Sequence, residues 1–212
     1  MNALLAKLEA KLGQKVRGLS PIGGGDINDA YLLEAEQRLF VKTRADAPPE
    51  MYACEAEGLC WLAEANALPC PRVVAVDAEF LVLEYVAPGA RRRDFDARLG
   101  RGLATLHRAG APYFGHARDN FIANLPQVNT PAPSFAAFYR EHRLGPLVDR
   151  LELALRKQFD RLYPRLSALI PDEPPARLHG DLWSGNVHTT SDGQPMLIDP
   201  AVYGGAREGD LA

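Results

Sequence analysis

The spacing of apolar residues divides the chain into a strand-rich first part and a helical second part. Residues 2–13 place leucines at helical spacing and stop at Gly13, which predicts a short amphipathic helix with a glycine cap. Pro48-Pro49 opens a second helical pattern that continues to about Ala67. The short apolar runs around it predict strands at Lys15–Ser20, Ala30–Ala35, Arg38–Thr43, Val73–Asp77 and Phe80–Tyr85.

Beyond Pro88-Gly89 the apolar spacing becomes helical. Helices are predicted around Leu99–His107, over Ser134–Leu144 and over Pro146–Leu169. The intervening segment, Gly110–Pro133, is rich in proline and asparagine and is expected to be a long irregular loop of the kind that often carries function. We therefore predict an α+β fold of two lobes, with residues 1–86 forming a β-rich N-terminal lobe and residues 87–212 a mainly helical C-terminal lobe.

Composition narrows the class of protein. The 212 residues include 24 Lys and Arg against 27 Asp and Glu, a net charge of −3. Nucleic-acid binding usually requires a basic excess, so no nucleic-acid partner is expected. Lys7, Glu9 and Lys11 interrupt the N-terminal leucines, and no apolar run reaches membrane-spanning length, so we expect no membrane segment and a cytoplasmic location.

The strongest chemical signal is the stretch from His179 to Asp199. It reads His-Gly-Asp-Leu-Trp-Ser-Gly-Asn, and Asp181 precedes Asn186 by the five residues that separate the corresponding pair in a kinase catalytic loop. A short apolar run then leads to Asp199. Phosphoryl transfer needs a carboxylate to accept the proton of the attacking hydroxyl, together with oxygen ligands for Mg²⁺. Asp181 is thus predicted as the catalytic base, and Asn186 and Asp199 as metal ligands.

A phosphate-binding region is predicted upstream. Gly23, Gly24 and Gly25 lie between two predicted strands, where backbone N–H groups can approach phosphates closely, although a triple glycine alone is weak evidence. Lys42 ends the strand Leu39–Val41, from which its ammonium can reach the phosphates of ATP. Glu55 in the following helix can orient that lysine through an ion pair, with Glu57 as the competing candidate.

The strand that ends at Glu84, Tyr85 and Val86 is predicted to meet the second lobe. Backbone groups of Glu84 and Val86 can pair there with the adenine of ATP, whatever their side chains. The alternative is an ordinary strand end.

Taken together, several stretches resemble the fructosamine kinase (ketosamine-3-kinase) family, which has the protein-kinase-like fold of aminoglycoside phosphotransferases. They are Gly24–Asn28, Phe40–Thr43, Asp119–Ile122 with Gln127–Asn129, His179–Asn186, and Asp199–Tyr203 with Arg207-Glu208. The resemblance extends from about Val16 to Ala212. It implies phosphorylation by ATP and Mg²⁺ of the 3-hydroxyl of ketosamines, as small molecules or on glycated protein side chains, in a deglycation reaction.

Separate expectations apply to five further residues: Trp183, Tyr203, Asp210, His107 and Arg44. Trp183 either stacks against the sugar or packs against the catalytic loop, and Tyr203 is a second candidate for substrate contact. Asp210 is expected to hydrogen-bond the backbone of the catalytic loop, and His107 to be a satisfied core histidine. Arg44 departs from the family, which usually has asparagine there.

The resemblance also leads to an expectation about the end of the chain. Family members continue through several more helices, so we expect an incomplete C-terminal lobe in which part of the surface around Leu144, Leu147, Leu151, Leu155 and Leu166 is exposed and favours self-association. Two other functions stay open at this point. One is an aminoglycoside- or choline-type hydroxyl kinase, and the other is an inactive nucleotide-binding module.

Overall fold

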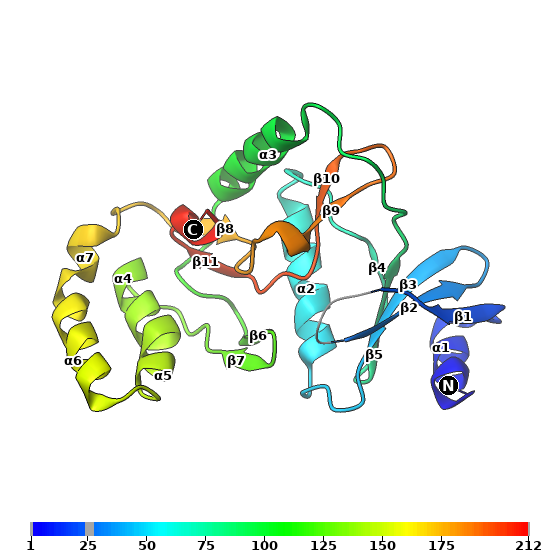
Figure 1. Ribbon diagram of the computed structural model, residues 1–212, viewed down its shortest axis with the longest axis horizontal. Helices are drawn as coiled ribbons and strands as arrows, with labels where there is room; N and C mark the ends of the chain where they lie inside the picture. Colours follow the sequence, from blue (N-terminus) through cyan, green and yellow to red (C-terminus); the bar gives the residue numbers. More distant parts are fainter. Residues whose placement is uncertain (1, 24–27, 212) are drawn as a thin grey trace.

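The computed structural model describes residues 2–23 and 28–211 (Figure 1). Its first part combines two helices with a five-stranded sheet of order β1-β2-β3-β5-β4, in which every neighbouring pair is antiparallel. These elements are α1 (Asn2–Leu12), β1 (Gly18–Pro21), β2 (Asp29–Glu34), β3 (Arg38–Thr43), α2 (Met51–Glu64), β4 (Val73–Val76) and β5 (Phe80–Glu84). The five strands and two helices predicted for this part are confirmed, with ends that shift by up to three residues.

The sheet is buried on both faces because a helix packs against each one. Along β5, Phe80 and Val82 pack with Leu8 of α1, whereas Leu81 and Leu83 pack with α2. Successive side chains of a strand point to opposite faces, so the continuous apolar run of β5 is the pattern expected of a strand covered on both sides. This packing fixes α2 against the face of β3 from which Lys42 projects.

The second part begins with α3 (Phe95–Ala109) and contains short strands and helices. They are β6 (Asn120–Ile122), β7 (Leu125–Gln127), α4 (Phe135–Phe138), the π-helix η1 (Tyr139–Leu144), α5 (Gly145–Val148), α6 (Leu153–Leu162), the 3-10 helix η2 (Tyr163–Arg165), α7 (Leu166–Leu169), β8 (Ala176–Leu178), the 3-10 helix η3 (Ser184–Asn186), β9 (Val187–Thr189), β10 (Pro195–Leu197), β11 (Tyr203–Gly205) and the 3-10 helix η4 (Arg207–Asp210). The antiparallel pair β8–β11 flanks the stretch from His179 to Asp199, and the antiparallel pair β9–β10 lies within it, between Asn186 and Asp199.

Three sequence predictions for this part are wrong in detail. The helix expected over Pro146–Leu169 is interrupted between α5 and α6 and again at η2, where Pro164 lies. Proline lacks the N–H that a continuous α-helix needs. The helix expected over Ser134–Leu144 changes to a π-helix at Tyr139, and the loop expected over Gly110–Pro133 contains the hairpin β6–β7.

The mixed α+β class is confirmed, and the boundary between lobes after Val86 stays a prediction. A buried cluster joins the two parts, formed by α2, α3 and the segments around β9 and β10; it includes Leu62, Leu103, Leu106, Val187 and Leu197. Within the described residues, no helix has the length and apolar character needed to cross a bilayer.

Candidate active site

A cavity of about 920 Å³ lies between the sheet, α2, the β6–β7 hairpin and the segment from Asp181 to Ala201. Its size suits a small-molecule site. The structure brings most of the predicted site residues to its wall, namely Gly23, Lys42, Glu55, Glu84, Tyr85, Val86, Asp181, Trp183, Asn186 and Asp199. The predictions for Gly24 and Gly25 lie outside the described residues.

Lys42 is the electrostatic centre of the cavity. Its Nζ donates to Glu55 Oε1 at 2.8 Å and to Asp199 Oδ1 at 2.6 Å, and the lysine side chain is only 8% exposed. Burial lowers the pKa of Lys42, but the two carboxylates outweigh it and raise that pKa above its ordinary value, so the ammonium is charged at neutral pH. Glu55, and not Glu57, is therefore the carboxylate beside Lys42.

Asp181 and Asn186 form a second polar group in the cavity. The Asn186 side-chain nitrogen donates to the Asp181 backbone oxygen at 2.7 Å and to Asp181 Oδ2 at 3.0 Å. With its nitrogen turned to Asp181, the amide of Asn186 directs its oxygen away from that residue. His179 supports the loop, because its Nε2 lies 2.9 Å from the Ile198 oxygen and its Nδ1 accepts from the Asp181 N–H at 3.3 Å. Burial lowers the pKa of His179, consistent with a neutral ring.

Asp210 fixes the backbone that precedes Asp181. Its carboxylate accepts the N–H groups of His179 and Gly180, both at 2.9 Å, and lies 3.0 Å from His107 Nε2. The expectations for Asp210 and for buried His107 are thereby confirmed. Gly180 has φ +82°, and a Cβ there would lie 2.1 Å from the Ala201 oxygen, so this turn requires glycine.

Asp199 stands in an unusual backbone conformation. Its φ is 56°, in the left-handed region that non-glycine residues seldom adopt, and such outliers often occur at functional sites.

Within residues 2–23 and 28–211, no group of three or more His, Cys, Asp and Glu side chains is arranged to hold a metal ion. An Mg²⁺ ion usually takes one or two carboxylates together with substrate phosphates and water. The Asn186 oxygen and the Asp199 carboxylate fit that donor set.

The end of the cavity at Glu84–Val86 differs from the polar centre. Its wall includes Phe40, Leu83 and Met196, which can sandwich a flat base. The Glu84 N–H donates to the Arg72 oxygen at 2.9 Å, and the Glu84 side chain accepts from the Arg72 N–H at 3.0 Å. The Glu84 side chain therefore stabilises the end of the strand. The predicted adenine contact uses backbone groups, so it does not need this side chain.

The two predicted substrate residues have different surroundings. Trp183 lines the cavity, is 59% exposed and lies over Gly185, where an added Cβ would contact its ring at 2.3 Å. Tyr203 is 5% exposed and packs between Phe138 and the Arg143 guanidinium, in a cluster outside the cavity wall. This placement gives no support to a substrate contact by Tyr203.

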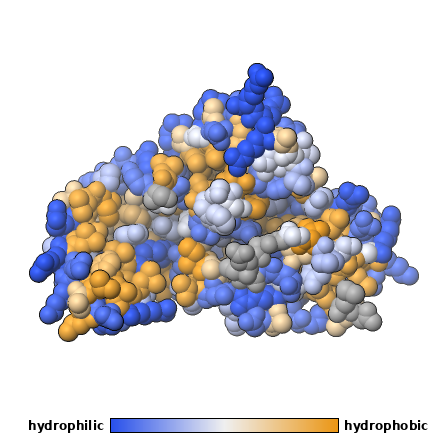
Figure 2. Space-filling model, viewed as in Figure 1, coloured by the Kyte–Doolittle hydropathy of each residue, from blue (hydrophilic) through white to orange (hydrophobic). Residues whose placement is uncertain are grey.

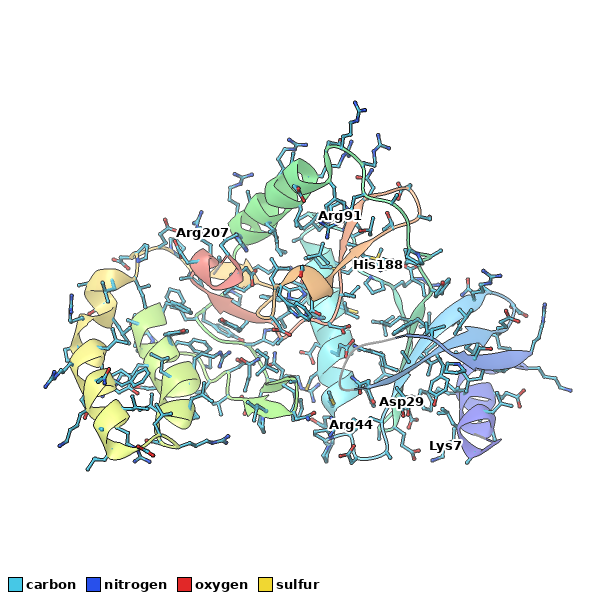
Figure 3. All side chains as sticks on the ribbon, in the orientation of Figure 1. Lys7, Asp29, Arg44, Arg91, His188 and Arg207 are labelled. Atoms are coloured by element: carbon cyan, nitrogen blue, oxygen red, sulfur yellow. The ribbon has the colours of Figure 1, made fainter. Side chains whose placement is uncertain are left out.

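Sequence reasoning missed part of the wall. Met51 and Cys54 of α2 line the cavity, as do Phe121 and Ala123 of the β6–β7 hairpin and His188 of β9, which Figure 3 labels. Cys54, Cys60 and Cys70 are free, and burial raises the pKa of the Cys54 thiol.

The chain is similar in sequence to proteins named ketoamine and ribulosamine kinases. A "Probable ketoamine kinase" of Synechocystis is 36% identical over 206 residues, which are 90% of this chain and 68% of that protein. The chloroplastic protein-ribulosamine 3-kinase of indica rice is 35% identical and matches 93% of this chain, which spans 62% of the rice protein. These two relatives are therefore about one and a half times as long as the region that matches this chain.

Solved structures agree with the fold. A fructosamine-3-kinase homologue from Thermobifida fusca superimposes with a TM-score of 0.89 at 34% identity, covering 100% of this chain and 77% of that one. The streptomycin–ATP complex of APH(2″)-IIa gives 0.68 at 16% identity, covering 99% and 73%, and shows a shared fold. The predicted protein-kinase-like fold is confirmed. The sequence model of the fructosamine kinase family matches residues 1–212, and the chain belongs to this family.

Proposed function

We propose that this protein transfers the γ-phosphoryl group of ATP to the 3-hydroxyl of ketosamines, as small molecules or on glycated protein side chains. The observation that carries the proposal is the placement of Lys42, between Glu55 and Asp199, in the same cavity as Asp181 and Asn186. The family supports the choice of acceptor, since relatives named ketoamine and ribulosamine kinases are about 35% identical to this chain. The two alternatives are an aminoglycoside- or choline-type hydroxyl kinase and an inactive nucleotide-binding module.

Each group has a role in the transfer. Lys42 binds the α- and β-phosphates, with Glu55 holding its ammonium in place, and Glu84–Val86 hold adenine. A phosphate-covering role for Gly23–Gly25 is proposed from the sequence alone. Asp181 orients the acceptor hydroxyl and takes its proton as the oxygen–phosphorus bond forms and the bond to ADP breaks. Asn186 and Asp199 would hold Mg²⁺, which would neutralise phosphate charge. Trp183 offers a ring face to the sugar.

An acceptor panel tests the proposed function. ADP release should be measured with ATP and Mg²⁺ on a fructosamine, a ribulosamine, an aminoglycoside and choline. We expect turnover on the ketosamines alone, because relatives about 35% identical to this chain are named for that acceptor class. Turnover on aminoglycoside or choline would assign the other kinase class. An ATP-dependent rise in Tm without ADP release on any acceptor would indicate a nucleotide-binding module.

We further infer self-association through the helices α5–α7. Leu147, Leu153, Leu155 and Leu169 are 45–68% exposed, whereas Leu166 is buried, which corrects the expected patch at that position. Figure 2 shows apolar residues gathered over this end of the molecule. We expect size-exclusion chromatography with light scattering to give a mass above 23.2 kDa that falls in Leu147→Ser/Leu155→Ser. A wild-type monomer at all concentrations would contradict this self-association.

The cytoplasmic location of the protein stays a prediction.

A further inference from the structure

Residues 118–129, which we call the strap, join α2 to the loop that carries Asp199. At the α2 end, Arg118 bridges two carboxylates, with Nη1 2.9 Å from Glu57 Oε2 and Nη2 2.5 Å from Glu50 Oε2. The Cys54 thiol lies 3.4 Å from the backbone oxygen of Asp119. The strap therefore contacts α2 through both charged and neutral side chains.

These contacts fall on one side of α2. At 3.6 residues per turn, Cys54 and Glu57 lie within about 60° of each other and about 100° and 160° from Glu55. Glu55 points to Lys42 from the remaining side of the helix. A strap that holds the Cys54–Glu57 side thus sets the rotation of α2 about its axis, and with it the position of the Glu55 carboxylate.

The residue that precedes α2 supports this view. Glu50 adopts φ 65°, a left-handed conformation that a non-glycine residue keeps only when its surroundings impose it. Its carboxylate is one of the two that Arg118 binds. Arg118 therefore fixes both the start of α2 and a point two turns further along it.

Close to Arg118, the strap is also tied to the Asp199 loop. Asn120, 5% exposed, donates to the Val202 oxygen at 2.8 Å. The end of the strap is held as well, because Arg143 donates to the Val128 oxygen at 2.8 Å and to Asn129 Oδ1 at 2.6 Å. The Arg143 guanidinium lies 4.5 Å from the ring centre of Phe138 and 4.3 Å from that of Tyr203, so it is rigidly placed.

The hairpin turn reaches the N-terminal sheet as well. Arg44, directly after β3, donates to the side-chain oxygen of Asn124 at the tip of the β6–β7 hairpin. Figure 3 labels Arg44 at the end of α2 where the hairpin lies. Residues flanking both partners of Lys42 are thus connected through one short segment.

We propose that the strap is a positioning element for nucleotide binding and that Arg118 is its principal positioning residue. By holding α2 and the Asp199 loop together, it keeps Glu55 and Asp199 at the distances from which Lys42 can engage phosphates. The inference rests on the proposed function for its kinetic readout, but its effect on nucleotide affinity can be measured without an acceptor.

The ion pairs of Arg118 are exposed, so their effect on nucleotide binding can be distinguished from an effect on the stability of the fold. The side chains of Arg118, Glu57 and Glu50 are 33%, 43% and 69% exposed. Ion pairs this exposed contribute little to folding. Loss of Arg118 should therefore change nucleotide binding while leaving Tm almost unchanged.

The test compares Arg118→Gln with Arg98→Gln, which removes a matched exposed pair on α3 in which Arg98 Nε lies 2.6 Å from Asp94. For Arg118→Gln we expect the Kd for Mg·ADP by calorimetry, and KM for ATP, to rise about threefold to tenfold, because α2 no longer holds Glu55 at its distance from Lys42. Arg118→Lys should fall between, since a point charge cannot bind both carboxylates in the same way. Adding Glu57→Gln to Arg118→Gln should cause a smaller loss than Glu57→Gln causes in the wild type.

Two results would overturn the proposal. One is an unchanged Kd for Mg·ADP in Arg118→Gln. The other is an equal loss of affinity in Arg98→Gln. If the wild type turns over no ketosamine, the proposed function fails while the Mg·ADP titrations still decide the role of the strap.

Discussion

Asp181→Asn should reduce kcat on a ketosamine by about 10²- to 10⁴-fold, the range expected for loss of a general base, with little change in Mg·ADP affinity. Asparagine has the same shape as aspartate, and its oxygen can still accept the hydrogen bond from Asn186 that now reaches Asp181 Oδ2 at 3.0 Å. The variant should therefore fold and bind nucleotide normally. Initial rates of ADP release and calorimetric titration with Mg·ADP provide the two measurements.

The matched control is Asp160→Asn, on the exposed side of α6 and away from the cavity. It loses the same charge and should retain the wild-type kcat. If Asp181→Asn kept wild-type turnover, Asp181 could not be the base, and the acceptor hydroxyl would have to lose its proton by another route.

Lys42→Met should abolish measurable nucleotide binding and destabilise the fold. Removing the ammonium leaves Glu55, 10% exposed, close to Asp199 with no cation between them. Breaking a buried ion pair in this way costs on the order of 3 kcal/mol, and partial exposure of Asp199 reduces that figure. Urea unfolding and titration with Mg·ADP measure the two effects.

The loss of stability in Lys42→Met should depend on pH. Burial already raises the pKa of Glu55, and Lys42 only partly offsets it, so removing Lys42 raises that pKa further. The folded protein then binds a proton more readily than the unfolded chain, and its stability relative to wild type should improve as pH falls from 8 toward 5. Adding Glu55→Gln should restore stability at pH 8 without restoring nucleotide binding. Wild-type affinity for Mg·ADP in Lys42→Met would contradict the phosphate-binding role.

The sheet and the catalytic loop could be predicted because local sequence determines both. β5 is an uninterrupted apolar run bounded by polar residues, and the spacing of Asp181 and Asn186 corresponds to one tight loop that a single neighbouring carboxylate, Asp210, holds in place. Lys42 could be paired with Glu55 because both follow from their positions on one strand and one helix.

The strap and the broken helices could not be predicted in the same way. Gly110–Pro133 contains the turn chemistry of a loop, and its short strands β6 and β7 are held by buried contacts such as the one between Asn120 and the distant Val202. Such long-range bonds have no signal in neighbouring residues. Tyr203 shows the opposite problem, because a residue in a family motif serves here to pack Arg143 and Phe138.

The position of the transferred phosphate tests the central claim most directly. The product formed from a ¹³C-labelled fructosamine, ATP and Mg²⁺ can be examined by ¹³C and ³¹P NMR. The proposed reaction predicts phosphorus coupling to the carbons around C3 and to no other part of the sugar, with one ADP released per product. A phosphate on another hydroxyl, or ADP release without a phosphorylated sugar, would contradict it.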